Sequence, residues 1–234
     1  MLGGLAALIV IPLRREKPGK WAITIGFASL GPLFILYLKA VEYMGAGLAA
    51  ILLYTAPIWV IVLSPLFSEQ VSSLGILAAI AGFLGVVLIS LPAMKLGEII
   101  GLLMGLGAGI AYASYMLFAR RASREGASTI ETGLYSQLFA AVEVSLIIHP
   151  TVKPNIYDLA GMLYLGVSTM IIPYMLHVRA LSLTKAYKVA IVSLLEPIGA
   201  TILAYMLLGE SLSLLQILGA VMILLSAALV SLKP

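Results

Sequence analysis

Residues 186–210 read AYKVAIVSLLEPIGATILAYMLLGE, an apolar stretch in which Glu196 and Pro197 stand side by side near the middle. A charge at the centre of a membrane helix costs roughly 2.5–3.5 kcal/mol, so such a residue is expected to face an interior, a cavity or a partner. Pro197 has no N–H, so the carbonyl of Ser193 loses its helical partner and the helix can bend there. The stretch therefore predicts a membrane helix with a polar site at its centre. The structural alternative is a protonated Glu196 that bonds a neighbouring helix, next to a proline that only shapes the chain.

The composition predicts an all-α polytopic membrane protein. Of the 234 residues, 62% are hydrophobic and 10% are charged, and the mean hydropathy is +1.13. Apolar runs repeatedly reach about 20 residues, the length of a membrane-spanning helix. The chain has no cysteine, which excludes a disulfide scaffold, a thiolate metal site and a cysteine nucleophile. His149 and His177 lie far apart and Asp158 is the sole aspartate, so we expect no metal site and no cofactor.

Eight segments are long and apolar enough to be predicted as membrane-spanning helices. They are residues 21–43, 46–67, 73–92, 97–118, 129–149, 156–178, 186–208 and 212–232. Residues 1–13 form a further apolar piece that is too short to span. The basic cluster follows this piece instead of preceding it, which does not fit a signal peptide. We interpret the piece as the end of a helix.

The basic residues predict the orientation of these helices. Eight spans place residue 14 and the C-terminus on the same side of the bilayer. On that side lie Arg14, Arg15, Lys17, Lys20, Arg120, Arg121, Arg124, Arg179, Lys185, Lys188 and Lys233, and on the other side Lys39, Lys95 and Lys153. Basic residues concentrate in cytoplasmic loops, so we predict a cell-membrane protein with a cytoplasmic C-terminus. Topology thereby accounts for the net charge of +4, and no nucleic-acid partner is expected.

The chain resembles itself at a shift of 140 to 141 residues. The shift pairs Pro57 with Pro197 and, after one inserted residue, Glu69 with Glu210. The paired helices run in opposite directions in the predicted topology. This is the pattern of an inverted repeat in secondary transporters, whose site lies near mid-membrane at the repeat interface.

We assign residues 1–92 to a first repeat and residues 97–234 to a second. The second repeat contains five helices, and residues 97–140 find no counterpart in the chain. The first repeat is therefore expected to lack one helix and most of another, as in a chain truncated at its N-terminus.

Three segments carry a resemblance to a known family. They are LLYTAPIWVIVLSPLFSEQ at 52–70, SLLEPIGATILAYMLLGESLS at 193–213, and the Ala-Leu pair at 180–181. Together they resemble the drug/metabolite transporter superfamily and, within it, the EamA-type transporters. The resemblance implies a ten-helix fold of two inverted five-helix repeats, which exports or exchanges small metabolites by alternating access. By this resemblance, the chain is expected to lack the first helix and much of the second.

Polar and aromatic residues inside the predicted helices are candidates for the site. Glu196 is the candidate for substrate binding or proton coupling, with Ser193 one turn before it. Tyr54, Trp59 and Tyr112 are candidate cavity walls. An aromatic ring packs against an apolar ligand while its polar tip forms a hydrogen bond.

Two further polar residues and two prolines complete the candidates. Gln137 and Glu143 lie inside the 129–149 helix and need interior partners, and packing between helices is the alternative role for Gln137. Pro57 and Pro197 are candidate hinges, with a static kink as the alternative at each.

A ridge of small residues recurs every four positions in the 97–118 helix. It consists of Gly97, Gly101, Gly105 and Gly109 and continues to Ala113. Such a ridge lets another helix approach closely, either inside one bundle or across a homodimer interface. Glu69 and Glu210 close their helices at the membrane surface and are expected to be solvated.

These observations favour a secondary transporter of a small metabolite in the lipid bilayer, without enzymatic activity. A membrane-embedded enzyme is the first alternative, but only Glu143 and Glu196 are acidic residues well inside the spans, and no catalytic set accompanies them. A non-transporting assembly subunit that uses the glycine ridge is the second alternative.

Overall fold

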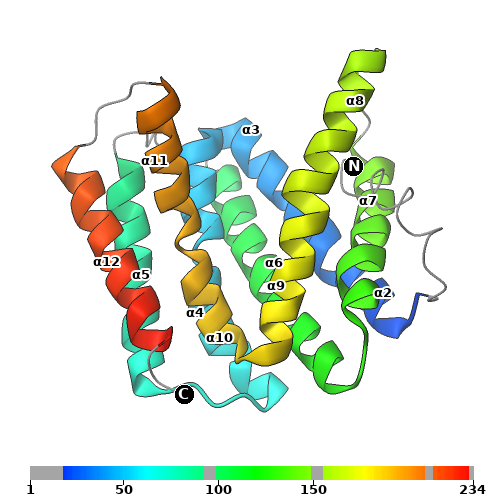
Figure 1. The fold of residues 1–234 in the computed structure, drawn as a ribbon, viewed down its shortest axis with the longest axis horizontal. Coiled ribbons are helices and arrows are strands. Elements are labelled where there is room, and N and C mark those ends of the chain that lie inside the picture. Colours follow the sequence, from blue (N-terminus) through cyan, green and yellow to red (C-terminus); the bar gives the residue numbers. More distant parts are fainter. Residues whose placement is uncertain (1–17, 92–98, 149–154, 209–212, 232–234) are drawn as a thin grey trace. The chain divides into compact units, whose positions relative to one another are not determined.

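The computed structural model describes residues 18–91, 99–148, 155–208 and 213–231, and every regular element in these residues is helical. The α-helices are α2 (Lys20–Ile25), α3 (Gly31–Leu53), α4 (Ala56–Leu63), α5 (Ser73–Ser90), α6 (Ile99–Arg124), α7 (Ser136–Ile147), α8 (Ile156–Leu165), α9 (Ile172–Leu183), α10 (Ala186–Ser193), α11 (Glu196–Leu208) and α12 (Leu214–Ser231). Three π-helical turns, η2 (Gly26–Leu30), η5 (Glu131–Tyr135) and η6 (Gly166–Ile171), join neighbouring helices, and η3 (Ser64–Phe67) is a 3₁₀ turn. The all-α class is confirmed, and Figure 1 shows these helices in chain order.

Five helical runs are long and apolar enough to cross a membrane, namely 20–53, 73–90, 99–124, 186–207 and 214–231. The first of them covers the predicted span 21–43 and the start of the span 46–67. Gly45 interrupts α3 between the two, with a φ of 80° and a ψ of 162°. This φ lies in the left-handed region that glycine adopts without steric cost. The chain therefore turns where the sequence predicts a connection between spans.

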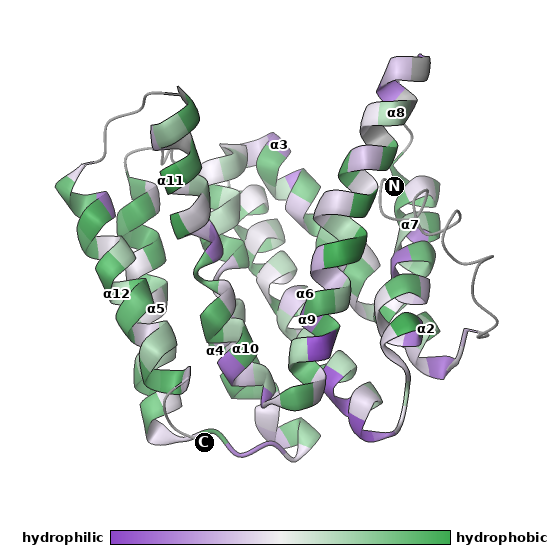
Figure 2. Ribbon diagram, in the orientation of Figure 1, coloured by the Kyte–Doolittle hydropathy of each residue, from purple (hydrophilic) through white to green (hydrophobic). Residues whose placement is uncertain are grey.

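The predicted spans 129–149 and 156–178 are also helical in their described residues. The first continues from η5 into α7, and its polar residues Thr132, Ser136, Gln137 and Glu143 lower its hydropathy. The second continues through α8, η6 and α9. Many apolar side chains on the helices are exposed, including Tyr157, Leu207 and Leu214, as expected of faces that contact lipid. Figure 2 shows this apolar character along most helices.

The chain divides into two compact units. Unit 1 comprises the chain up to Leu36 and Ser114–Thr184, and unit 2 comprises Tyr37–Ala113 and Lys185–Pro234. Each unit takes helices from both predicted repeats, because α3 and α6 each pass from one unit to the other. The repeat boundaries at 1–92 and 97–234 stay a prediction, and residues 1–13 lie outside the described residues.

In unit 1, two π-helical turns precede two prolines that lie 141 residues apart, one residue off the frame of the repeat in this region. η2 ends before Pro32 and η6 ends before Pro173. In η2 the Gly31 N–H bonds the Gly26 carbonyl five residues back, and in η6 the Ile172 N–H bonds the Val167 carbonyl in the same way. Proline cannot donate to the helix, so the backbone changes its hydrogen-bond spacing just before each ring.

In unit 2, two helices break at positions that the repeat also pairs. One break is at residues 54–55, between α3 and α4, and the other is at residues 194–195, between α10 and α11. Three backbone hydrogen bonds recur at a shift of 140 residues. At the first break, the N–H of Thr55 donates to the Leu52 carbonyl, and the N–H groups of Ile58 and Trp59 donate to the Thr55 carbonyl. At the second break, the N–H of Leu195 donates to the Val192 carbonyl, and the N–H groups of Ile198 and Gly199 donate to the Leu195 carbonyl. Pro57 and Pro197 each lie in the first turn of the helix after the break, where a missing N–H costs nothing.

The helices α5 and α12 pack closely in unit 2. A Cβ placed on Gly85 would stand 2.7 Å from the Gly219 carbonyl oxygen, and one on Gly219 would stand 2.5 Å from the Gly85 carbonyl oxygen. Only glycine permits this approach at both positions. The pair supports the broken helices, because Val86, Ile89 and Ile223 of α5 and α12 lie in the same buried cluster as both breaks.

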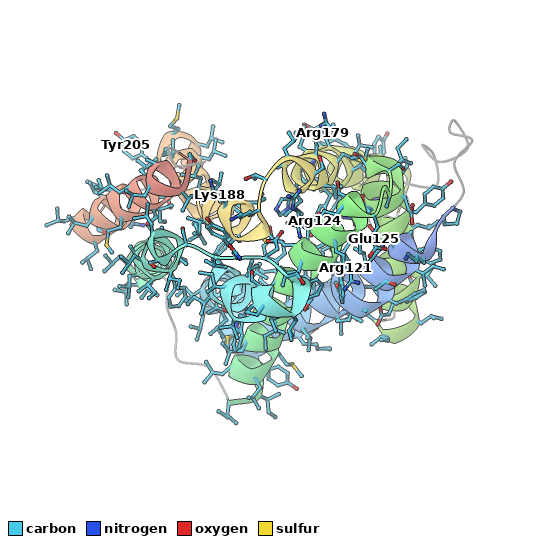
Figure 3. All side chains as sticks on the ribbon, turned by 90° about the horizontal axis from the view of Figure 1, so that it is seen from below. Arg121, Arg124, Glu125, Arg179, Lys188 and Tyr205 are labelled. Carbon is cyan, nitrogen blue, oxygen red and sulfur yellow. The ribbon has the colours of Figure 1, made fainter. Side chains whose placement is uncertain are left out.

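One end of unit 1 gathers the charged residues that the topology places on one side. Lys20 Nζ donates to Glu125 Oε2 at 2.8 Å, and Arg121 Nε donates to Glu125 Oε1 at 3.1 Å. Arg120 Nη1 donates to the carbonyls of Leu181 and Ser182, at 2.9 Å each. Figure 3 labels Arg121, Arg124 and Glu125 at the end of α6, and Figure 2 shows hydrophilic residues there.

The expectation that Glu69 is solvated is wrong. Its side chain is 5% exposed, and its Oε2 accepts a hydrogen bond from the Ala186 N–H at 3.1 Å, at the start of α10. A carboxylate is stabilised at a helix N-terminus because it satisfies a free N–H and complements the helix dipole. Glu210 lies outside the described residues.

Candidate functional site

The two helix breaks meet in the core of unit 2. Tyr54 from the first break and Leu194 from the second lie in one buried cluster, 8% and 1% exposed. Ile198 of α11 belongs to the same cluster. A broken helix exposes backbone polar groups, so the place where two breaks meet is a natural place for a polar ligand in a membrane protein.

Glu196 opens α11 immediately after the second break. Its carboxyl forms a hydrogen bond with the Tyr54 hydroxyl, so a residue of one break bonds a residue of the other. No ion pair involves Glu196 among the described residues. Glu196 is exposed, whereas Tyr54 is buried.

Tyr112 of α6 and Ser193 of α10 complete the group. The two side chains share a hydrogen bond, and Tyr112 interacts electrostatically with Glu196. The Ser193 hydroxyl also lies 2.9 Å from the Val189 carbonyl, to which it donates. We call Tyr54, Tyr112, Ser193 and Glu196 the Glu196 site.

The glycine ridge places Tyr112 at this site. A Cβ on Gly105 would stand 2.5 Å from Leu52 Cδ1, and one on Gly109 would stand 2.5 Å from Thr55 Oγ1. α6 therefore lies directly against the first break, and Tyr112 follows Gly109 by one helical turn. The ridge from Gly101 to Gly109 packs inside unit 2, and Gly97 lies outside the described residues. A homodimer stays a prediction.

Trp59 lies beside the first break. Its Nε1 donates to Thr55 Oγ1 at 3.1 Å, and the Thr55 hydroxyl donates to the Leu52 carbonyl at 2.6 Å. These two bonds stabilise the broken backbone. Trp59 therefore stabilises the first break, and it stays a candidate for the wall of a cavity.

Gln137, like Glu143, lies in unit 1, while the other sequence candidates lie in unit 2. It is 2% exposed, and its Nε2 has no hydrogen-bond partner among the described residues.

Tyr37 of α3 is a residue that the sequence reasoning missed. It is half-buried in unit 2 and interacts electrostatically with Glu196 and Tyr54. The sequence could have indicated Tyr37, because it is an aromatic residue inside a predicted span, which is the feature that made Tyr54 and Tyr112 candidate cavity walls.

The Glu196 site is able to bind a polar group that donates hydrogen bonds. A carboxylate accepts from an ammonium or a hydroxyl, tyrosine rings attract a cation, and phenolic and seryl hydroxyls both donate and accept. Among the described residues there is no group of three or more His, Cys, Asp or Glu side chains that could hold a metal ion. These groups are suited to reversible binding of a polar molecule or a proton.

Comparison with known proteins gives a consistent result. A model of the EamA-like transporter family matches residues 1–91 and 99–232. An uncharacterized transporter of Archaeoglobus fulgidus is 29% identical over 188 residues, which cover 80% of this chain and 68% of the relative. Protein PecM of Dickeya dadantii is 28% identical over 228 residues, which cover 93% of this chain and 76% of PecM. A solved crystal structure matches with a TM-score of 0.82 at 18% identity, over 99% of this chain and 85% of the other, and so shares the fold.

Proposed function

The chain belongs to the EamA-like transporter family of multi-pass membrane proteins, and from this premise we propose that it is a secondary transporter of a small metabolite. The substrate carries an ammonium or hydroxyl group that donates a hydrogen bond to the Glu196 carboxyl. Transport proceeds by alternating access, in the direction of export or exchange.

The observation that supports this proposal is the hydrogen bond between Tyr54 and Glu196. It joins two breaks that occupy matched positions in the predicted inverted repeat, which is where transporters of this design place their sites. An unpaired carboxylate is costly in the membrane, so in the absence of a cationic partner Glu196 takes up a proton or a cationic substrate. That exchange provides a route for coupling transport to protons.

The broken helices support alternating access. Residues 54–55 and 194–195 interrupt otherwise apolar helices, and a helix that is already broken can change its bend with little loss of backbone hydrogen bonding. We assign Pro57 and Pro197 to the hinges, and Glu196, Ser193, Tyr54, Trp59, Tyr112 and Gln137 to binding or coupling.

The cell membrane is the proposed location, with a cytoplasmic C-terminus. The contacts of Lys20 with Glu125 and of Arg120 with Leu181 support this orientation, because they bring three basic segments to one end of unit 1. Basic residues concentrate on the cytoplasmic side of such proteins. The transporter names of the relatives favour transport over catalysis.

The test is uptake by proteoliposomes with and without a pH gradient, screened over radiolabelled amines, amino acids and polyols. We expect one class of substrate to be carried and the Glu196→Gln protein to lose its dependence on the pH gradient, because the amide cannot titrate. A Glu196→Gln protein that folds normally and keeps the full pH dependence would contradict the coupling role.

Tyr54→Phe is the matched variant, since it removes one hydroxyl and leaves the ring that packs in the core. A hydrogen bond to a charged group contributes about 1.5–3 kcal/mol, so substrate binding is expected to weaken roughly tenfold or more. Unchanged substrate affinity in Tyr54→Phe would show that this hydroxyl does not position the carboxyl.

A further inference from the structure

Glu143 of α7 lies against Gly31 at the junction of η2 and α3, inside unit 1. A Cβ on Gly31 would overlap Glu143 Oε2, so the absence of a side chain at this position makes room for the carboxyl. The Oε2 atom is buried and has no hydrogen-bond partner among the described residues. The carboxyl therefore occupies a seat on the backbone of the neighbouring helix without a bond that would stabilise its charge.

The seat forms because η2 and α7 pack closely along their length. A Cβ on Gly26 would overlap the Phe139 Cβ and would stand 2.9 Å from the Ser136 carbonyl oxygen. Gly26 and Gly31 thus bring the π-helical turn against α7 at two levels. π-helical turns are rare and frequently lie at functional sites.

Two more buried polar groups lie on the same pair of elements. Ser29 in η2 is 0% exposed and Gln137 in α7 is 2% exposed, and neither Ser29 Oγ nor Gln137 Nε2 has a hydrogen-bond partner among the described residues. Buried polar atoms in native proteins are nearly always bonded, so three unbonded polar atoms on two packed elements distinguish this part of unit 1 from an ordinary apolar helix contact.

The charged and titratable groups of the surrounding elements do not pair with Glu143. η2 has none, Lys20 of α2 is bound to Glu125, and Glu131 of η5 accepts from the Trp21 N–H at 3.2 Å. Tyr135 is the other titratable group of η5, and on α3 Lys39 is bound to Glu42 at 2.7 Å. No ion pair involves Glu143 among the described residues.

We propose that Glu143, seated against Gly31, is a second proton-binding site of this transporter, separate from Glu196. Glu143 as a whole is half-buried, but its Oε2 atom is buried without a hydrogen-bond donor, which disfavours the charged form. The group is therefore expected to hold a proton at neutral pH. The proton leaves when the packing of η2 on α7 changes, so that the carboxyl reaches water. The release of the proton rests on the proposed transport function, whereas the binding of the proton does not.

The test of the bound proton is infrared spectroscopy of the purified protein in lipid nanodiscs at neutral pH. The carbonyl band of a protonated carboxylic acid is expected in the wild-type spectrum and is expected to lose intensity in Glu143→Gln. Glu42→Gln is the control, because Glu42 is exposed and paired with Lys39, so this substitution should leave the band unchanged.

Gly31→Ala is the second variant. It keeps the Glu143 carboxyl but fills the space against the backbone that the carboxyl occupies. We expect the band to persist at low pH and to titrate at a different pH from the wild type. It supplies the decisive result should Glu143→Gln fail to fold. A neutral-pH band unaffected by Glu143→Gln, or an unchanged titration in Gly31→Ala, would overturn the proposal.

The release of the proton during transport is tested by measuring the number of protons moved per substrate molecule in proteoliposomes. Glu143→Gln is expected to lower this number while substrate binding persists, and an unchanged number would overturn the exchange of the proton. A wild-type protein that carries no substrate but shows the Glu143 band would contradict the proposed function alone. The two failures are therefore distinguishable.

Discussion

Ala56 and Glu196 stand at matched positions of the two broken helices, yet only Glu196 has a carboxyl. Tyr54 and Leu194 are matched in the same way, and only Tyr54 has a hydroxyl. The hydrogen bond between Tyr54 and Glu196 therefore uses the one polar residue of each pair. Two broken helices with a similar backbone thus carry different side chains, and the proposed site takes one polar residue from each of these two pairs.

At the residue scale, Glu125 predicts a small dependence of stability on pH. Hydrogen bonds from Lys20 and then Arg121 hold the pKa of the Glu125 carboxyl below its usual range, and Glu125 lies just outside the membrane helix α6. A lowered folded-state pKa stabilises the fold above the unfolded pKa of about 4.3, and this stabilisation is lost as pH falls through the folded-state pKa.

Thermal unfolding in detergent of wild type and Glu125→Gln checks this prediction. The wild type is expected to be slightly more stable at neutral pH, and the difference should vanish in acid. Because the group is exposed, high salt should shrink the difference as well. A difference that grows in acid would contradict the assignment.

At the element scale, the breaks before Pro57 and Pro197 predict effects on turnover. Alanine at position 197 supplies an N–H and favours a continuous helix across residues 194–195, since proline costs roughly 3 kcal/mol or more inside a helix. We expect Pro197→Ala to slow transport more than it weakens substrate binding, because the change of state is the step that needs bending.

Steady-state transport and equilibrium binding, measured side by side, separate the two roles. The paired Pro57→Ala protein provides the comparison, because it alters the other break and leaves the Glu196 element unchanged. An equal loss of affinity with unchanged turnover would mean that the prolines shape the site and do not move it.

At the scale of the whole molecule, the distribution of basic residues predicts a cytoplasmic 119–128 loop and an external 149–154 loop. The chain has no cysteine, so labelling of a single introduced cysteine shows on which side of the membrane that residue lies. In intact cells, an impermeant thiol reagent is expected to label Val152→Cys, and to label Ala127→Cys only after permeabilisation. The reverse pattern would invert the topology.

The sequence by itself determined the helical class, the helix positions and the places where helices break. These properties are local: apolar runs of membrane length form helices, and a proline removes a backbone donor wherever it stands. Gly45 between two spans and the breaks before Pro57 and Pro197 follow from these rules. The family could be identified because its Glu-Pro and Gly-Glu motifs also lie within short segments.

Only the tertiary structure decided which distant residues meet. Tyr54 reaches Glu196, Tyr37 lies near both, and Glu69 is buried against the start of α10. Glu143 takes its seat because Gly31, far away in the chain, has no side chain. Such contacts depend on how closely two helices approach and at which level they cross. The spacing of residues along one helix, as in the glycine ridge, permits a close approach but does not specify which helix approaches or at which level.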